Sequence, residues 1–302
     1  MNENFLWINE HLSLVEEGKL KDAKNLLFSK LPNTLYKYKP LNDYALNSVK
    51  YEAVWLSDLA SLNDPYECNM QFNIDQMIDD FFHSPSFLAD FKKVHDTAIT
   101  EEEHDAIKRS NNQWGTYKSI CIAKGLSIIE ENEMRNELFN KWQETTDMVR
   151  KKVRLCSFSE RSDSAIMWSH YADHHKGICV EYDFRKSNQE IEYLYPIFYT
   201  DNLFEYRFFV RPRSVNQFAY ASIQKGLDWQ YEKEWRIIFP YERLDTTYYY
   251  KVPTPKAIYL GSRFDENDND KKEMLFELCH RYNIPLYKMK LHDTEYKMVQ
   301  VE

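Results

Sequence analysis

Glycine is scarce in this 302-residue chain, and its scarcity excludes two classes of nucleotide site. The chain has six glycines, about 2% of its residues against a usual ~7%. Each glycine stands apart from the others, at positions 18, 115, 125, 177, 226 and 261. Neither a G-x-G-x-x-G fingerprint nor a Walker loop occurs, so a Rossmann dinucleotide site and a P-loop are excluded.

Long apolar runs, a surplus of basic residues and paired cysteines are also missing. The absence of a run of about 18 apolar residues predicts no membrane-spanning helix and no membrane partner. The net charge of −9 argues against a surface that coats nucleic acid. Five scattered cysteines without a C-x-x-C motif predict no disulfide framework and no cysteine-rich zinc site. Together with an N-terminus unlike a secretory signal, they predict a cytoplasmic protein.

The chain is rich enough in apolar residues, at 43%, to build a full core. Residues 1–32 show two apolar stripes separated by Gly18, which predicts a helical hairpin. We expect residues 33–302 to form one core domain, with a helical insertion at about 72–150. Strand patterns occur at 35–41, 51–57, 153–160, 177–184, 192–200, 229–239, 246–252, 257–264 and 284–290, and helical patterns at 165–173 and 267–282. This grouping predicts an α+β fold with a mixed, mainly antiparallel sheet.

The segment 229–239 carries the first candidate site. On a strand, Glu232, Glu234 and Arg236 would share one face. Two carboxylates within about 7 Å repel each other, which can raise the pKa of one and produce an acid or base for catalysis. The alternative is an exposed edge strand with an ordinary ion pair. The neighbouring Trp229 and Trp235 favour the functional interpretation, because an exposed edge would not need them.

The helix predicted at 165–173 carries the second candidate site. Trp168, His170 and Tyr171 lie close together there, and His170 or Tyr171 could contact a substrate. His170 and His174 have the i, i+4 spacing of metal ligands, but the glutamate of an H-E-x-x-H helix is absent. At a helix C-terminus, histidines also serve as partners of backbone carbonyls. We therefore expect no metal, and a packed aromatic helix remains the alternative.

The third candidate combines a basic strand with a turn. Lys37 and Lys39 would lie on one strand face, where two cations can hold a phosphate. Asn63-Asp64-Pro65 follows as a turn sequence. The alternative for the lysines is an exposed edge strand protected from aggregation by its charges.

These motifs together resemble a bacterial family known as domain of unknown function 2971, over residues from about 33 to 265. The individual motifs are common, and their combination is specific. They are Lys37-Tyr-Lys39, Asn63-Asp64-Pro65-Tyr66-Glu67, Cys156-Ser-Phe-Ser159, Trp168-Ser-His170-Tyr171-Ala, His174-x-x-Gly177 and Trp229-x-x-Glu232-x-Glu234-Trp235-Arg236.

The order of the charged residues is also similar to that of the ADP-ribosyltransferases. This resemblance implies NAD as the cofactor, with Lys37 or Lys39 gripping it and His170 or Tyr171 shaping the pocket. It implies Glu234 as the catalytic residue, with Glu232 orienting the acceptor. The residues expected at the cofactor are Lys37, Lys39, Asn63, Asp64, Ser157, Trp168 and Arg236.

The leading hypothesis is an intracellular bacterial enzyme that uses NAD, an ADP-ribosyltransferase or NAD glycohydrolase acting as a toxin or phage-defence effector. Its partners would be a small-molecule nucleotide and a protein or nucleic-acid acceptor. One alternative is a non-catalytic sensor that binds a ligand or protein, with residues 1–32 docking the protein partner. Another is a metal-dependent nuclease using Asp64, Glu67, Glu232, Glu234 and His170.

Overall fold

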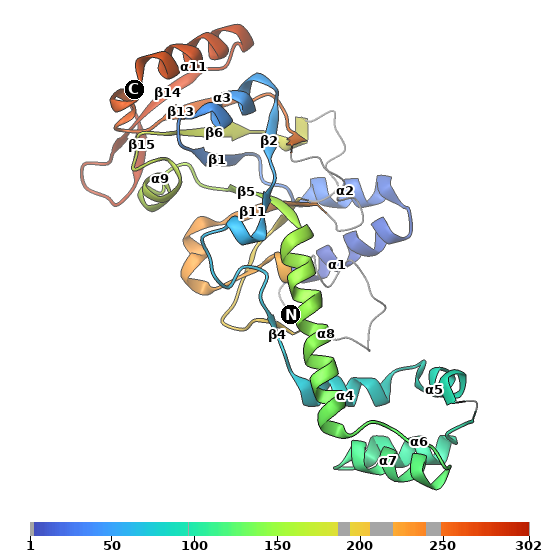
Figure 1. The fold of residues 1–302 in the computed structure, drawn as a ribbon. Coiled ribbons are helices and arrows are strands. Elements are labelled where there is room, and N and C mark those ends of the chain that lie inside the picture. The colour runs from blue at the N-terminus through green and yellow to red at the C-terminus, as the bar shows by residue number, and fades with distance from the viewer. Residues whose placement is uncertain (1–2, 96, 187–193, 206–219, 240–248, 302) are drawn as a thin grey trace. The chain divides into compact units, whose positions relative to one another are not determined.

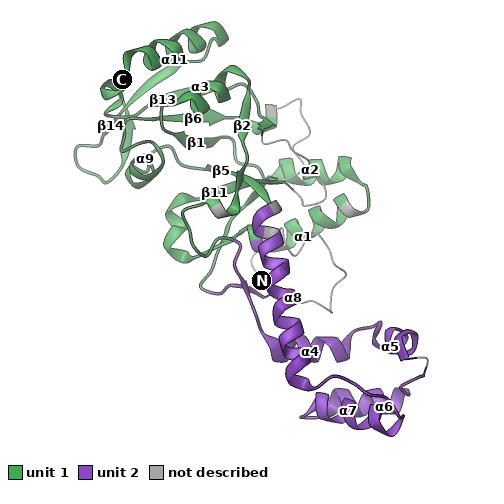
Figure 2. Ribbon diagram, viewed as in Figure 1, with its two compact units in different colours: residues 1–67, 152–201, 222–302 green, residues 68–151, 202–221 purple. Residues whose placement is uncertain are grey.

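A computed structural model of the chain describes residues 3–95, 97–186, 194–205, 220–239 and 249–301. The chain forms two compact units, distinguished by colour in Figure 2. Unit 1 comprises residues 1–67, 152–201 and 222–302, and unit 2 comprises residues 68–151 and 202–221. Unit 1 therefore holds the predicted hairpin together with the sheet.

A nine-stranded sheet, counted over the described residues, forms the centre of unit 1 (Figure 1). Its order is β15-β14-β13-β6-β1-β5-β11-β7, with β3 also paired to β5. All pairs are antiparallel except β13 with β14. The strands are β1 Leu35–Lys39, β3 Ser57–Asp58, β5 Arg154–Ser159, β6 Ile178–Tyr182, β7 Leu194–Pro196, β11 Glu234–Phe239, β13 Ala257–Leu260, β14 Leu286–Leu291 and β15 Met298–Gln300.

Smaller strand pairs complete the described β structure. β2 (Ala53–Trp55) pairs with β12 (Tyr249–Lys251), and β8 (Phe198–Tyr199) pairs with β10 (Gln224–Lys225). The β8–β10 pair fixes the position of Lys225, the last residue of β10, which is one of the residues of the candidate site.

Unit 1 carries five described α-helices: α1 (Glu3–Glu16), α2 (Leu20–Lys30), α3 (Asp43–Lys50), α9 (Ala165–Tyr171) and α11 (Asn269–Tyr282). α9 begins where the Ser164 hydroxyl accepts a hydrogen bond from the backbone N–H of Met167. The Trp168 ring is fully buried and packs edge-on against Tyr38 of β1, which fixes α9 on that face of the sheet.

The N-terminal hairpin packs into unit 1. Trp7 of α1 is buried, and its ring lies 6.4 Å from that of Tyr195 in β7. Gly18 separates the two helices at a φ of +73°, as expected for a residue that ends a helix. Docking of a protein partner by residues 1–32 stays a prediction.

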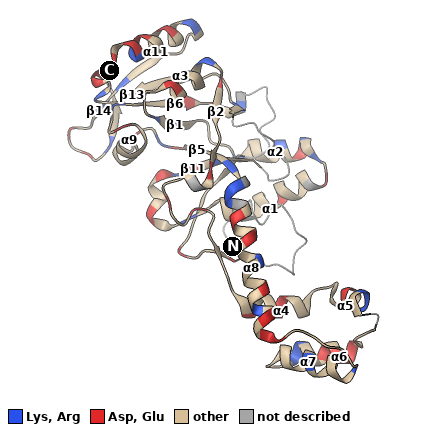
Figure 3. Ribbon diagram, viewed as in Figure 1, with Lys and Arg blue, Asp and Glu red and all other residues tan. Residues whose placement is uncertain are grey.

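Unit 2 is mainly helical in its described part. Its helices bury an aromatic core that includes Phe82, Phe87 and Trp114. Acidic and basic residues both occur along its helices (Figure 3). The elements are β4 Met70–Gln71, α4 Ile74–His83, α5 Phe87–His95, α6 Glu101–Arg109, α7 Gln113–Ala123, α8 Glu131–Lys152 and β9 Phe204–Glu205.

The predicted α+β class with a mixed, mainly antiparallel sheet is confirmed. The single strand predicted over 229–239 is wrong in its first half. Residues Leu227–Glu232 form the 3-10 helix η3, and Lys233 ends it in the left-handed region at a φ of 42°, so β11 begins only at Glu234. The final strand β15 was not predicted, and parts of the patterns at 192–200 and 246–252 lie outside the described residues. No described helix is long and apolar enough to cross a bilayer.

Candidate functional site

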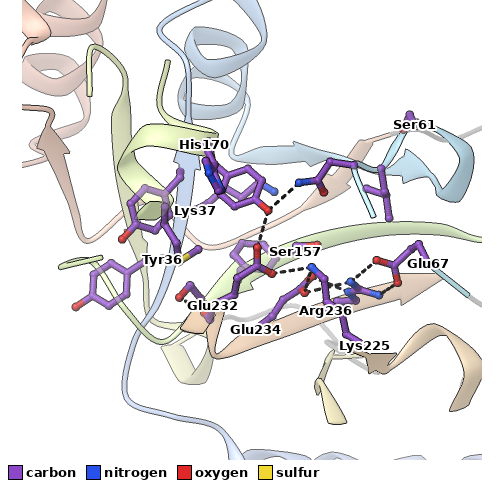
Figure 4. A pocket seen from close by; sticks show the side chains of 17 residues that line it. Tyr36, Lys37, Ser61, Glu67, Ser157, His170, Lys225, Glu232, Glu234 and Arg236 are labelled. Atoms are coloured by element: carbon purple, nitrogen blue, oxygen red, sulfur yellow. Dashed lines mark hydrogen bonds and ion pairs between the residues drawn. The ribbon is translucent and has the colours of Figure 1, made fainter. Parts of the chain in front are cut away.

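A cavity of about 360 Å³ opens on one face of the unit 1 sheet, which is large enough for a small ligand (Figure 4). Its floor comes from β1, β5 and β11, and its sides come from α9, the turn after residue 60 and η3. The lining residues are Tyr36, Lys37, Tyr38, Ser61, Leu62, Asn63, Glu67, Ser157, Phe158, Ser159, Met167, His170, Tyr171, Lys225, Glu232, Glu234 and Arg236.

Strand register explains why residues far apart in the chain meet at this cavity. Glu234 of β11 pairs with Ser159 of β5, and Ser159 also pairs with Tyr36 of β1. Arg236 pairs with Ser157 one step further along. Since directly paired residues point to the same side of a sheet, all five side chains lie on the cavity face.

Arg236 is the centre of a buried ion-pair network. It is 1% exposed, and its Nε donates to Oε1 of Glu234 at 2.6 Å. Its terminal nitrogens donate to both carboxylate oxygens of Glu67, one of them at 2.9 Å, and to the carbonyl of Ser222. Arg236 therefore ties the turn sequence around Glu67 to the sheet with paired hydrogen bonds, the geometry that a guanidinium favours.

Lys225 joins the two candidate carboxylates. Its Nζ donates to Oε2 of Glu232 at 2.7 Å and to Oε2 of Glu234 at 3.1 Å. It also lies 4.5 Å from the centre of the Trp229 ring, which covers it on one side. Glu232 precedes β11, but its carboxylate lies near that of Glu234 because both accept hydrogen bonds from Lys225.

Glu232 and Glu234 have opposite electrostatic environments. Burial raises the pKa of Glu232, against the opposing effect of Lys225. Burial would raise the pKa of Glu234 as well, but the charges of Arg236 and Lys225 lower it to about 2. Glu234 is thus held as a carboxylate, while burial favours the protonated form of Glu232.

Tyr171 connects Glu232 to the opposite side of the cavity. Its phenol donates to Oε1 of Glu232 at 2.5 Å and accepts from Nδ2 of Asn63 at 3.2 Å (Figure 4). Burial raises the pKa of Tyr171, and the neighbouring Glu232 charge raises it further. The phenol therefore stays protonated and donates to the carboxylate.

Lys37 and Lys39 do not converge with these carboxylates. Strand alternation turns both lysines to the face opposite Tyr36, and the Lys37 ammonium lies 5.9 Å from the centre of the Phe158 ring. Lys39 is not among the residues that line the cavity, and burial lowers its pKa to about 8. Lys37 is nevertheless among the residues that line the cavity, and contact of either lysine with a cofactor stays a prediction.

Two other residues predicted at the cofactor, Trp168 and Asp64, make hydrogen bonds to nearby backbone groups. The Trp168 indole is fully buried and donates to the carbonyl of Ser162, which fits the packed-helix alternative for this residue. Oδ1 of Asp64 accepts from the backbone N–H of Tyr66, so Asp64 shapes its own turn. Neither side chain is among those lining the cavity.

The helical spacing of His170 and His174 is not realised, because α9 ends at Tyr171 and residues 173–175 adopt left-handed backbone conformations. His170 lines the cavity, and its Nδ1 lies 3.4 Å from the phenol oxygen of Tyr231. Among the residues that the structure describes, no three histidine, cysteine, aspartate or glutamate side chains are grouped so as to hold a metal ion.

Sequence reasoning did not identify Lys225, and it did not connect Glu67 with Arg236. Lys225 is a single lysine in an apolar segment, and no pattern around it indicates a buried ion pair. Glu67 belonged to a recognised motif, but its partner lies 169 positions away. Only the register of the sheet brings these residues together.

Comparison with known proteins gives one match. The model of a family described as "Protein of unknown function (DUF2971)" matches residues 167–237, and this segment is similar to that family. No curated protein and no solved structure matches the chain. The matched segment supplies His170, Tyr171, Lys225, Glu232, Glu234 and Arg236, which are the residues on which the cavity's chemistry depends.

Proposed function

We propose that unit 1 is an enzyme that uses NAD and breaks the bond between nicotinamide and ribose, passing ADP-ribose to water or to a protein or nucleic-acid acceptor. One observation carries the proposal: the buried Glu232 carboxylate accepts a hydrogen bond from Tyr171 inside a cavity of ligand size. A buried carboxylate with a raised pKa, placed beside a hydroxyl group, suits acid–base work on a glycosidic bond.

The charge of the network supports this chemistry. Three buried carboxylates, Glu67, Glu232 and Glu234, face two buried cations, Lys225 and Arg236, so the network carries one net negative charge. Cleavage of a glycosidic bond develops positive charge on the ribose. A fixed negative charge in a site with little water stabilises that charge most strongly.

The C–N bond breaks, and its electron pair stays on the nicotinamide nitrogen, which loses its formal positive charge. The positive charge that develops at the ribose carbon lies near the Glu232 carboxylate. Water or an acceptor group then bonds to that carbon, and its proton passes to Glu232 and from there to solvent.

In this proposal Glu232 takes the role that the resemblance to ADP-ribosyltransferases gives to Glu234. The charges of Arg236 and Lys225 lower the pKa of Glu234 to about 2, so it is poorly suited to receive a proton, whereas burial raises the pKa of Glu232. Glu234 instead holds the two cations in position. The diphosphate is not assigned to Lys37 or Lys39, because alternation places both side chains on the sheet face opposite Tyr36, although Lys37 is among the residues lining the cavity.

The test follows the release of nicotinamide by chromatography when the purified full-length chain is incubated with NAD. We expect Glu232→Gln to lower the rate by about 10²-fold or more. The matched control is Glu273→Gln on the exposed surface of α11, which should cleave NAD at the wild-type rate. No release by the wild-type chain, with or without candidate acceptors, would refute the proposal.

We place this activity in the bacterial cytoplasm, in a toxin or phage-defence effector, because loss of NAD stops growth. Induced expression should then lower cellular NAD and arrest growth, and expression of Glu232→Gln should do neither. Growth arrest that persists in Glu232→Gln at unchanged NAD would contradict this setting.

A second candidate is a binding module without catalysis. It is favoured by the complete pairing of Glu67, Glu234 and Arg236, which is what a structural network requires. Under this alternative the wild-type chain does not cleave NAD, and Glu232→Gln would change only the affinity for the ligand. The nuclease alternative has less support, because Arg236 occupies both oxygens of Glu67 and holds Glu234 as well.

A further inference from the structure

The cavity face of the sheet continues past Tyr36 into a second group of polar and aromatic side chains. Tyr36 pairs with Glu181 of β6, and Glu181 pairs with Ala257 of β13. Directly paired residues share a face, so Glu181 lies in one row with Ser159 and Glu234. Three strand spacings separate Glu181 from Glu234, which is about 14 Å.

Glu181 is held by two donors at this place. Oε1 accepts from Nζ of Lys256 at 2.6 Å, and Oε2 accepts from the phenol of Tyr259 at 2.8 Å. The carboxylate is buried, whereas the Lys256 side chain is 54% exposed. The group therefore offers a fixed acceptor beside an accessible cation, the two features that bind ribose hydroxyls and a phosphate.

Tyrosine rings link this group to the cavity. Tyr36 lines the cavity, and its ring lies 6.1 Å from that of Tyr259. The Tyr259 ring in turn lies 5.5 Å from the ring of Tyr287 on β14, at an interplanar angle of 34°. All three rings are partly exposed, so they can stack a base.

We propose that Glu181, Lys256 and the rings of Tyr36, Tyr259 and Tyr287 form a second subsite for the nucleoside and phosphate of a dinucleotide that are not cleaved. This inference rests on the proposed function, because it assumes that the bond to be broken lies at Glu232. It assigns a place to the half of NAD that is not cleaved, and it puts the ligand across strands β11, β5, β1 and β6.

The test compares the binding of NAD and of nicotinamide mononucleotide by titration calorimetry with the full-length chain. We expect NAD to bind at least about tenfold more tightly, since the mononucleotide lacks the group that reaches Lys256. Lys256→Ala should weaken NAD binding by about tenfold and leave mononucleotide binding unchanged. Tyr259→Phe, which keeps the ring, should weaken NAD binding less.

Lys290→Ala is the matched control, because Lys290 is exposed on β14 and alternation places it on the face opposite Tyr287. It should not change either affinity. Equal affinities for the two ligands, or an unchanged NAD affinity in Lys256→Ala, would overturn the subsite alone. NAD binding without cleavage would overturn the proposed function and leave the subsite standing, whereas failure to bind NAD would overturn both.

Discussion

The phenol of Tyr171 donates a 2.5 Å hydrogen bond to Oε1 of Glu232, a residue 61 positions later in the chain. Tyr171 ends α9, and Glu232 ends the 3-10 helix η3. Both residues lie within the segment 167–237 that matches the family model. The bond therefore joins two parts of that segment across the cavity and holds the Glu232 carboxylate in position.

Replacement of Tyr171 by phenylalanine tests how this bond controls Glu232. The bond lowers the pKa of Glu232, so its loss should raise that pKa further above the ordinary value. The ionised carboxylate is the active form in our proposal, and activity is lost as pH falls through its pKa. The acid side of the kcat profile should therefore move to higher pH in Tyr171→Phe, with kcat at its optimum lower by about tenfold.

The measurement is the pH dependence of NAD cleavage by both proteins. Tyr282→Phe is the control, because that phenol donates to the carbonyl of Lys50, outside the cavity. Its profile should coincide with that of the wild type. A Tyr171→Phe profile that keeps its midpoint, or shifts it to lower pH, would contradict the assigned bond.

Glu67→Gln tests how much the buried ion-pair network contributes to the free energy of unfolding. This substitution removes the carboxylate that accepts two hydrogen bonds from Arg236 and leaves part of the guanidinium charge uncompensated. The free energy of unfolding in urea should fall by about 3 kcal/mol. Glu266→Gln removes a carboxylate from the exposed ion pair with Arg263 and should not change it measurably. An equal decrease in the free energy of unfolding in the two variants would contradict the prediction that the buried pair stabilises the fold more than the exposed pair.

Local patterns predicted much of the fold. The alternation at 35–41, 153–160 and 177–184 corresponds to β1, β5 and β6, and the helical pattern at 165–173 corresponds to α9. The error at 229–233 has a local cause. Aromatic and polar residues alternate over 229–232 as in a strand, but the backbone turns at Lys233 in a left-handed conformation that side-chain polarity does not reveal.

The candidate site was predictable only in part. Glu232, Glu234, Arg236, His170 and Tyr171 belong to short motifs that indicate chemistry, and all five line the cavity. Lys225 and the Glu67–Arg236 pair depend on long-range register, which one sequence does not contain. The direction of the Lys37 and Lys39 side chains depends on which sheet face carries the site, and alternation alone leaves both faces open.

Gly177→Ala tests the connection that holds α9 over the sheet. A Cβ at Gly177 would lie 2.2 Å from the carbonyl oxygen of Lys39, so the backbone must shift. The free energy of unfolding should fall by about 1–3 kcal/mol, and NAD cleavage should fall with it if Tyr171 is displaced. Gly226→Ala is the control, since a Cβ there meets only the Trp229 ring at 4.0 Å. A Gly177→Ala protein as stable as Gly226→Ala would contradict the close approach.

His11 should make the stability of unit 1 depend on pH. It is 1% exposed, and its Nδ1 lies 3.1 Å from the phenol oxygen of Tyr195. Its Nε2 is buried and has no hydrogen-bond partner within the described part of the chain. Burial lowers its pKa from 6.5 to about 4. The unfolded chain therefore binds more protons than the folded chain between these values. The contribution of His11 is fully present above pH 6.5 and is lost as pH falls toward 4.

The measurement is the free energy of unfolding in urea at pH 7 and at pH 4.5. The loss between the two pH values should be smaller in His11→Leu than in the wild type, by about 2.5 kcal/mol. Each protein serves as its own reference, so the packing cost of the substitution cancels. His280→Leu, at an exposed position on α11, should show the wild-type loss. If His11→Leu loses as much stability as the wild type, the imidazole is not held neutral by burial against Tyr195.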